Sequence, residues 1–171
     1  KMGYCPRGKY GGRVIIPSFN NEGDCNYFIA RSYVGHGRRY LNPPCGRDII
    51  YNELNVDWDE PIILVEGVFD AIVAGDNAIP ILGSTLREDS KLFQAIAIHD
   101  TPVYIALDPD AEKKAKWIIR SLMKYDLEIK KLNIGTYEDI GSMSPEVFQK
   151  RLQNAEDVDG DLYFLEKQLR N

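Results

Sequence analysis

The feature that most constrains the fold is an unbroken apolar run, Ile62-Ile63-Leu64-Val65, which lies between Pro61 and Gly67. A half-exposed strand alternates polar and apolar residues, whereas a continuous apolar run is typical of a strand covered on both faces of a parallel sheet. Parallel strands need long crossover connections, and these are usually helices. The run therefore predicts an α/β domain whose other strands lie further along the chain.

Strand and helix patterns do alternate after this run. Expected helices cover residues 67–75, 89–98 and 111–125, and a last one opens at Ser144-Pro145, where Ser suits the cap and Pro the first helical position. Further strands are expected at 78–82, 103–107 and 128–134. The predicted fold class is α/β: a compact, mostly parallel sheet with helices on both faces, preceded by a small basic β-rich subdomain.

The β-rich prediction rests on residues 14–17 and 27–32, which read as two strands around a polar turn, Asn20-Asn21-Glu22-Gly23-Asp24. Two glycines and two prolines make residues 35–44 a loop, and the polar segment before Pro61 marks a boundary. We therefore expect an N-terminal subdomain over 1–57, an α/β domain over 58–153 and an acidic tail or linker over 154–171.

Charge is distributed unevenly along the chain. Residues 1–50 hold eight Lys or Arg against three acidic residues, a net charge of +5, and the remaining residues have a net charge of -10. This asymmetry indicates a basic surface for a polyanion beside an acidic region that could hold cations, although an uneven solvated surface would also produce it.

Composition and cysteine usage exclude several classes of protein. With 44% hydrophobic and 27% charged residues, the chain is neither disordered nor fibrous. It shows neither a membrane-length apolar run nor a secretory signal, so we expect a cytoplasmic location. The cysteines Cys5, Cys25 and Cys45 form no Cys-x-x-Cys pair, so we expect them to be reduced thiols and predict no bound zinc. The alternative is a zinc site formed by the three cysteines and His36.

Acidic residues come after three of the predicted strands. Glu66 ends the first strand with Asp70 four residues later, Asp108 and Asp110 follow the third, and Asp139 follows the fourth after Glu138. Singly, such residues can interact with a helix dipole or cap a helix. Because the carboxyl ends of parallel strands share one edge, we expect these carboxylates to gather there. Such a group repels itself, so it indicates a divalent cation, and ligands that are all oxygen favour Mg2+ or Mn2+.

Three segments in this region resemble the TOPRIM domain of primases and topoisomerases: Leu-Val-Glu-Gly-Val-Phe-Asp-Ala at 64–71, Leu-Gly-Ser-Thr-Leu at 82–86, and Ala-Leu-Asp-Pro-Asp-Ala at 106–111. The resemblance implies that Glu66, Asp108 and Asp110 are catalytic, and that two or more Mg2+ or Mn2+ ions are bound. Gly67 and Gly83 are expected to form turns. The metal ligands that the resemblance implies are Glu66, Asp70, Asp108, Asp110 and Asp139.

The upstream segments at 13–19, 28–31 and 39–44 resemble the basic subdomain that precedes TOPRIM in bacterial and phage replicative primases. The chain departs from the family in having Arg39 where Lys is usual, in a short connection after the prolines, and in lacking a zinc ribbon. These departures suggest a phage or plasmid relative, and we expect further domains outside the chain. The resemblance implies that nucleotide or template is bound by Arg13, Arg31, Arg38, Arg39, Tyr40 and Asn42.

The implied function is that of the RNA polymerase core of a DNA primase, which makes short RNA primers on single-stranded DNA by metal-dependent nucleotidyl transfer. The implied partners are ribonucleoside triphosphates, a single-stranded DNA template and a replicative helicase, either fused or separate. No membrane is implied, and the location would be a bacterial cell or a phage-infected host. Two alternatives stay open: a TOPRIM nuclease that uses the same carboxylates to activate water, and a nucleic-acid-binding module without catalysis.

Overall fold

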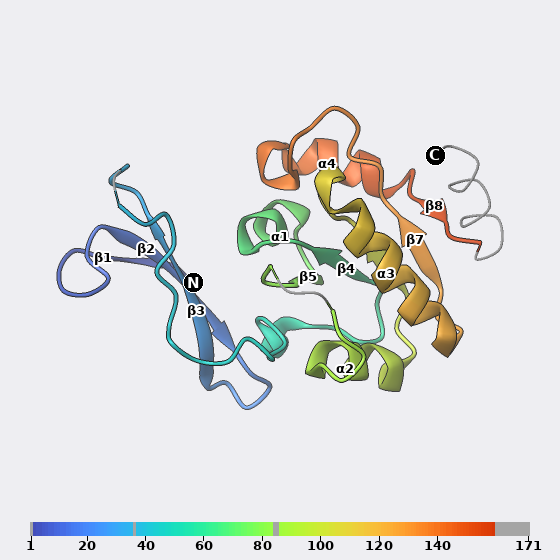
Figure 1. Cartoon of the computed structure of the whole chain (residues 1–171), viewed down its shortest axis with the longest axis horizontal. Coiled ribbons are helices and arrows are strands. Elements are labelled where there is room, and N and C mark those ends of the chain that lie inside the picture. Colours follow the sequence, from blue (N-terminus) through green and yellow to red (C-terminus); the bar gives the residue numbers. More distant parts are fainter. Residues whose placement is uncertain (1, 36, 84–85, 160–171) are drawn as a thin grey trace. The chain divides into compact units, whose positions relative to one another are not determined.

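The computed structural model describes residues 2–35, 37–83 and 86–159. The chain forms two compact units, which divide between Val56 and Asp57 (Figure 1). Each unit has its own sheet, and each is described by itself below.

The N-terminal unit is built on a three-stranded antiparallel sheet of order β1-β2-β3, formed by β1 (Gly3–Cys5), β2 (Arg13–Phe19) and β3 (Cys25–Ser32). The turn between β2 and β3 is closed by the side chain of Asn20, which accepts a hydrogen bond from the Asp24 N–H at 2.7 Å. These two strands confirm the sequence prediction. The pattern did not predict β1, because three residues that include a glycine carry no periodicity.

A later loop of this unit runs along β3 and holds it. The Ser32 N–H donates to the Arg39 carbonyl, and the Leu41 N–H donates to the Ala30 carbonyl. The hydroxyl of Tyr51 donates to the Ile16 carbonyl at 2.9 Å, just before the short 3-10 helix η1 (Glu53–Asn55). These contacts fix the loop that contains the predicted basic residues against the sheet.

The C-terminal unit contains a five-stranded sheet of order β5-β4-β6-β7-β8, in which only β8 is antiparallel to its neighbour. The predicted α/β fold with a mostly parallel sheet is thus confirmed. The strands are β4 (Ile62–Val65), β5 (Ala78–Pro80), β6 (Val103–Ile105), β7 (Ile129–Lys131) and β8 (Glu156–Asp157).

Both faces of this sheet are covered, and every residue of β4 is buried. Ile63 and Val65 belong to a core that includes Ala74 and Phe148. Ile62 and Leu64 alternate to the opposite face, where α3 lies in Figure 1. The helices and short 3-10 turns are α1 (Val68–Ala74), α2 (Lys91–His99), η2 (Pro109–Ala111), α3 (Glu112–Leu122), η3 (Met123–Tyr125), η4 (Ile140–Ser142) and α4 (Pro145–Leu152).

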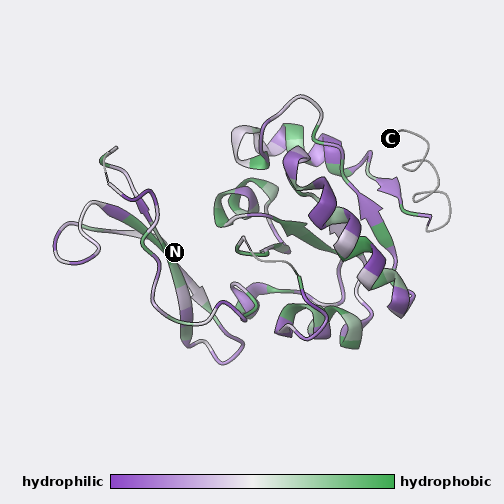
Figure 2. Ribbon diagram, viewed as in Figure 1, coloured by the Kyte–Doolittle hydropathy of each residue, from purple (hydrophilic) through white to green (hydrophobic). Residues whose placement is uncertain are grey.

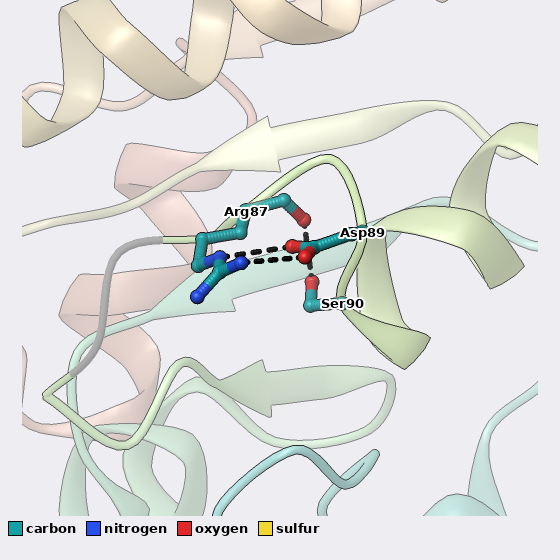
Figure 3. Close-up of polar contacts among 3 residues, drawn as sticks. All are labelled: Arg87, Asp89 and Ser90. Carbon is teal, nitrogen blue, oxygen red and sulfur yellow. Dashed lines mark hydrogen bonds and ion pairs between the residues drawn. The ribbon is translucent and has the colours of Figure 1, made fainter.

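Local side chains set where the helices begin. Ser144 accepts a hydrogen bond from the Val147 N–H, as expected for the cap of α4. Ser90 caps α2 in the same way, and its hydroxyl also donates to the Arg87 carbonyl at 2.7 Å. Figure 3 shows this turn, in which the Arg87 guanidinium also forms a two-point ion pair with Asp89.

The segment expected as an acidic tail or linker, 154–171, begins inside the C-terminal unit. Glu156 and Asp157 pair with Lys131 and Lys130 as β8, so these residues extend the sheet. Residues 160–171 lie outside the described part of the chain. Across the described residues, no helix combines the length and the apolar character that a membrane crossing requires.

Candidate metal centre

The sheet brings two predicted acidic residues to the same edge. Glu66 directly follows β4, and Asp108 comes three residues after β6. These strands are parallel neighbours, with Leu64 opposite Ile105. Both side chains therefore emerge at the carboxyl ends of adjacent strands, which is the usual location of sites in sheets of this type.

Glu66, Asp108 and Asp110 form one carboxylate group, in which one oxygen from each residue lies within 4.8 Å of the others. Asp108 is at the N-cap position of η2 without a side-chain cap hydrogen bond, and Asp110 lies within η2, so it is not the cap of α3. Among the described residues, these three are the only acidic, histidine or cysteine side chains that come together in a group of three at this spacing.

Two oxygens of this group lack a hydrogen-bond donor. Glu66 Oε1 and Asp108 Oδ1 are buried and have no hydrogen-bond partner in the described part of the chain. A buried carboxylate oxygen without a partner is costly, on the order of 1–3 kcal/mol or more. A hard cation with oxygen ligands would satisfy both atoms, so the donor set fits Mg2+ or Mn2+.

The electrostatics agree with a cation site. Burial raises the pKa of Asp108 to about 7, with further contributions from Asp70, Glu66, Asp139 and Asp110. The carboxylates therefore lie close enough to disfavour one another's charge. A bound divalent cation would remove this penalty by favouring the ionised form of each ligand.

Asp70, expected as a further ligand, accepts hydrogen bonds from two backbone N–H groups in the structure. Its Oδ2 accepts the Gly67 N–H at 2.8 Å and its Oδ1 accepts the Gly141 N–H at 3.0 Å. The buried carboxylate thereby joins the first turn of α1 to η4, although the two are far apart in sequence. Burial raises the pKa of Asp70 despite these two hydrogen bonds, with Asp139 and Glu66 adding to the effect. Asp70 thus lies beside the group and positions its neighbours.

Glycines at both contacts of Asp70 leave room for its carboxylate. A Cβ at Gly67 would lie 3.1 Å from Asp70 Oδ2, and one at Gly141 would lie 3.1 Å from Oδ1. Gly67, predicted as a turn residue, is the N-cap of α1. Gly83 has a φ of 71°, a left-handed value that suits a turn after β5.

The remaining expected ligand, Asp139, lies just before η4 and contributes to the raised pKa values of Asp70 and Asp108. It therefore lies near the group, but it is not one of the three side chains that could share one ion at close spacing.

Lys114 is a member of the site that the sequence analysis missed. Its Nζ lies 3.1 Å from Glu66 Oε2, and both side chains are about three-quarters buried, with exposures of 24% and 21%. A helix beginning near Asp110 places a residue four positions later on the same face, so the spacing of Asp110 and Lys114 is the sequence signal that could have found it. The carboxylate group is thus partly neutralised by a lysine on α3.

In the N-terminal unit, Arg13 does more than present a charge. Its guanidinium donates to the carbonyls of Arg38 at 2.8 Å, and of Arg39 and Ala30 at 3.4 Å each. It therefore fastens the 38–39 segment to β3. Asn42 has a comparable position, since its side-chain oxygen accepts the Ala30 N–H at 3.2 Å.

Arg31, Arg39 and Tyr40 do gather at one place in this unit. The Cζ atoms of both arginines lie 5.8 Å from the centre of the Tyr40 ring, which is 41% exposed. Arg38 is exposed next to them in the same segment. The structure thus brings three of the six expected nucleotide or template residues, Arg31, Arg39 and Tyr40, into one basic patch, and gives Arg13 and Asn42 supporting contacts.

The three cysteines are free thiols, with Cys25 and Cys45 exposed and Cys5 half-buried. His36, the fourth member of the alternative zinc site, lies outside the described residues.

The fold and the site together define an α/β domain with a carboxylate group at the carboxyl edge of a mostly parallel sheet, attached to a small antiparallel unit. No family model and no curated protein matches the chain by sequence. Solved structures do match, among them several primase catalytic and RNA polymerase domains. The fold of this chain is shared with about half of the primase catalytic domain.

Three of these structures show the extent of the likeness. The Aquifex aeolicus primase, comprising zinc-binding and RNA polymerase domains, matches with a TM-score of 0.70 and 22% identity over 89% of this chain and 42% of its own. The DnaG primase catalytic domain bound to single-stranded DNA matches with a TM-score of 0.70 and 21% identity, over 91% of this chain and 56% of its own. The primase domain of bacteriophage T7 matches with a TM-score of 0.56 and 9% identity, over 85% of this chain and 79% of its own. The chain thus spans about half the length of the first two.

Proposed function

We propose that this chain is the RNA polymerase core of a DNA primase, which joins ribonucleoside triphosphates on a single-stranded DNA template. The observation that carries the proposal is the carboxylate group at the ends of β4 and β6, with its two buried, unpartnered oxygens, in a fold shared with primase RNA polymerase domains. The fold alone would not suffice, because one fold can serve several activities.

The carboxylates would act as metal ligands. Glu66, Asp108 and Asp110 would hold Mg2+ or Mn2+, with Asp70 fixing the turn beside Glu66 and Asp139 adding negative charge nearby. Bound divalent cations supply the activation of a 3′-hydroxyl and the neutralisation of a pyrophosphate leaving group in nucleotidyl transfer. No side chain needs to act as a nucleophile.

The basic patch of the N-terminal unit would bind phosphate. Arg31 and Arg39 present fixed forks of N–H donors beside the Tyr40 ring, and arginine suits phosphate through this geometry. An exposed aromatic ring beside two cations also suits the stacking of a base from a single strand. The DnaG catalytic domain of similar fold is described as bound to single-stranded DNA, which supports this assignment.

Two other functions use the same features. A TOPRIM nuclease would use the carboxylates to activate water, and a binding module would need neither metal nor catalysis. The nuclease is disfavoured because the three similar structures described above contain primase domains. The binding module is disfavoured because it would have no need of buried carboxylate oxygens without partners.

One experiment separates the three functions. The purified chain is incubated with single-stranded DNA, labelled ribonucleoside triphosphates and Mg2+ or Mn2+, and the products are resolved on a sequencing gel. A primase yields labelled oligoribonucleotides. Degradation of the DNA without synthesis would indicate a nuclease, and unchanged DNA with no labelled product would indicate a binding module.

A further inference from the structure

The solvent side of α3 carries a row of basic residues around one exposed tryptophan. Counted from Lys113, the other members follow after three, four and seven residues, so all four share one face of the helix: Lys113, Lys116, Trp117 and Arg120. Residues on the other side, such as Ile118, Ile119 and Leu122, are fully buried. Figure 2 shows hydrophilic bands along the length of α3. We call Lys113, Lys116, Trp117 and Arg120 the α3 row.

The two lysines of the row differ from four other lysines of this part of the chain. Lys114, Lys124, Lys130 and Lys131 each form an ion pair with an acidic side chain. Within the described residues, no such pair involves Lys113 or Lys116. Their charges are therefore directed to solvent, in a unit whose sequence is acidic overall.

Trp117 makes the row more than a charged helix surface. Its side chain is 40% exposed, whereas the apolar face of α3 supplies ample buried positions. What sets this ring apart from other exposed apolar side chains is its place on the same helix face as three cations. Alternating cations and an aromatic ring match the two groups of a single strand, its phosphates and its bases.

The dimensions of the row also suit a strand. At 1.5 Å per residue, Lys113 and Arg120 lie roughly 10 Å apart along the axis, a length comparable to about three nucleotides at the 3.4 Å rise of one strand. The helix starts directly after Asp108 and Asp110, so the row begins one turn from the proposed metal ligands.

We propose that the α3 row binds single-stranded nucleic acid, with Lys113, Lys116 and Arg120 contacting phosphates and Trp117 stacking on a base. Resting on the proposed function, this inference adds a contact surface on the C-terminal unit to the arginine patch of the N-terminal unit. The ligand is the single-stranded DNA template, recognised by backbone charge and by stacking and not by sequence.

Tryptophan fluorescence tests the inference directly, because the chain has only two tryptophans. Trp58 is stacked on His99 with ring centres 5.0 Å apart, so Trp58→Phe leaves Trp117 as the single reporter. Titration with an oligothymidylate, in the absence of nucleotide and metal, should quench this fluorescence to saturation. If Trp58→Phe does not fold, the parent is compared with Trp117→Phe, which should lose the saturable quenching.

The lysines are tested in the same assay. Lys113→Gln with Lys116→Gln should weaken binding on the order of tenfold near 0.1 M salt, and should reduce the slope of log affinity against log salt by roughly 1.4. The matched control is Lys124→Gln, which removes a lysine paired with Glu88 and should leave affinity unchanged. An unchanged melting temperature in the double variant confirms that folding is intact.

Failure of this inference is distinguishable from failure of the proposed function. If the chain binds the oligonucleotide by fluorescence anisotropy but Trp117 is not quenched, or if the double lysine variant binds as the parent does, the α3 row is not a nucleic-acid surface. An acidic protein partner would then be the alternative occupant, and primer synthesis would be unaffected. If Trp117 is quenched but no primer is made, the inference stands and the polymerase function falls.

Discussion

The ammonium group of Lys114 lies 3.1 Å from Oε2 of Glu66, while the other oxygen of the same carboxylate, Oε1, is buried without a partner in the described part of the chain. The negative charge of Glu66, a proposed metal ligand, is thus partly neutralised by Lys114. The lysine therefore competes with a cation for the charge of Glu66, and a metal ion must bind against its repulsion.

Replacing this lysine should make metal binding tighter. For Lys114→Met we expect a lower melting temperature without metal, because Glu66 loses its counter-charge. We also expect the Mg2+ concentration for half-maximal thermal stabilisation to fall on the order of tenfold, as expected for the removal of about 1.4 kcal/mol of repulsion. Thermal melting against Mg2+ concentration measures both effects.

The neighbouring Lys113→Met serves as the control for this measurement, since Lys113 lies on the solvent side of α3 and Lys114 is the lysine paired with Glu66. A Lys114→Met protein that needs the same or a higher Mg2+ concentration than the parent would show that the ammonium does not oppose the metal.

The raised pKa of Asp108, about 7, predicts how the metal-free protein responds to pH. The unfolded chain loses this proton near the ordinary value of about 4, so between these two values the folded state binds more protons. This carboxyl therefore lowers stability as the pH rises from about 4 to 7, and the loss is complete above pH 7. Asp108→Asn, which imitates the protonated form, should raise the metal-free melting temperature at pH 8.

The same substitution should raise the melting temperature less at pH 5, because only the first part of the loss between about pH 4 and pH 7 has occurred there. Melting curves in a chelating buffer at both pH values provide the comparison. Equal shifts at pH 5 and pH 8 would contradict the raised pKa.

Asp70 should matter for folding in a way that Glu66 does not. Asp70→Ala leaves the N–H groups of Gly67 and Gly141 without their acceptor, and we expect a loss of about 2 kcal/mol or more in the free energy of unfolding. Glu66→Gln retains size and polarity, and the loss of its ion pair with Lys114 is offset by the end of its repulsion with Asp108 and Asp70, so the substitution should change this free energy by less than about 1 kcal/mol. Urea unfolding without metal gives both values. A smaller loss for Asp70→Ala than for Glu66→Gln would exclude the positioning role.

Binding of single-stranded DNA should depend on the arginines around Tyr40. Arg31→Ala with Arg39→Ala removes both cations from the ring, so we expect weaker binding and a salt dependence that is shallower by roughly 1.4 in log-log slope. The control is Arg87→Ala, because that guanidinium is already paired with Asp89. Fluorescence anisotropy of a labelled oligonucleotide at several salt concentrations reports the affinity. Salt-independent binding by the parent would place the template path elsewhere.

Much of this architecture can be predicted from short-range sequence patterns. The apolar run of β4 and the acidic residues directly after β4 and β6 were predictable, because parallel strands end at one edge and bring the residues after them together. The cap of α4 at Ser144 was predictable because its hydrogen bond is local. The α/β class itself is indicated by alternating patterns of this kind.

The contacts that refine the site were not predictable, because they join residues distant in sequence. Asp70 meets Gly141 only when the sheet and its helices are assembled. Lys114 carries a partial signal in its spacing from Asp110, but its contact with Glu66 also depends on this assembly. The same is true of Arg13, whose three carbonyl contacts depend on how the 38–39 segment folds back onto β3. Strand β8 was not predictable either, because two residues paired antiparallel at a sheet edge carry no pattern of their own.

The variant Glu66→Gln tests whether the carboxylate group performs metal-dependent nucleotidyl transfer. The substitution removes the charge of one ligand and retains its size, so the variant should fold and should bind single-stranded DNA as the parent does. Synthesis of labelled dinucleotides and primers on single-stranded DNA, with Mg2+ and Mn2+ in parallel, should fall by orders of magnitude. A folded Glu66→Gln protein that synthesises primers at the rate of the parent would contradict the assignment of this site.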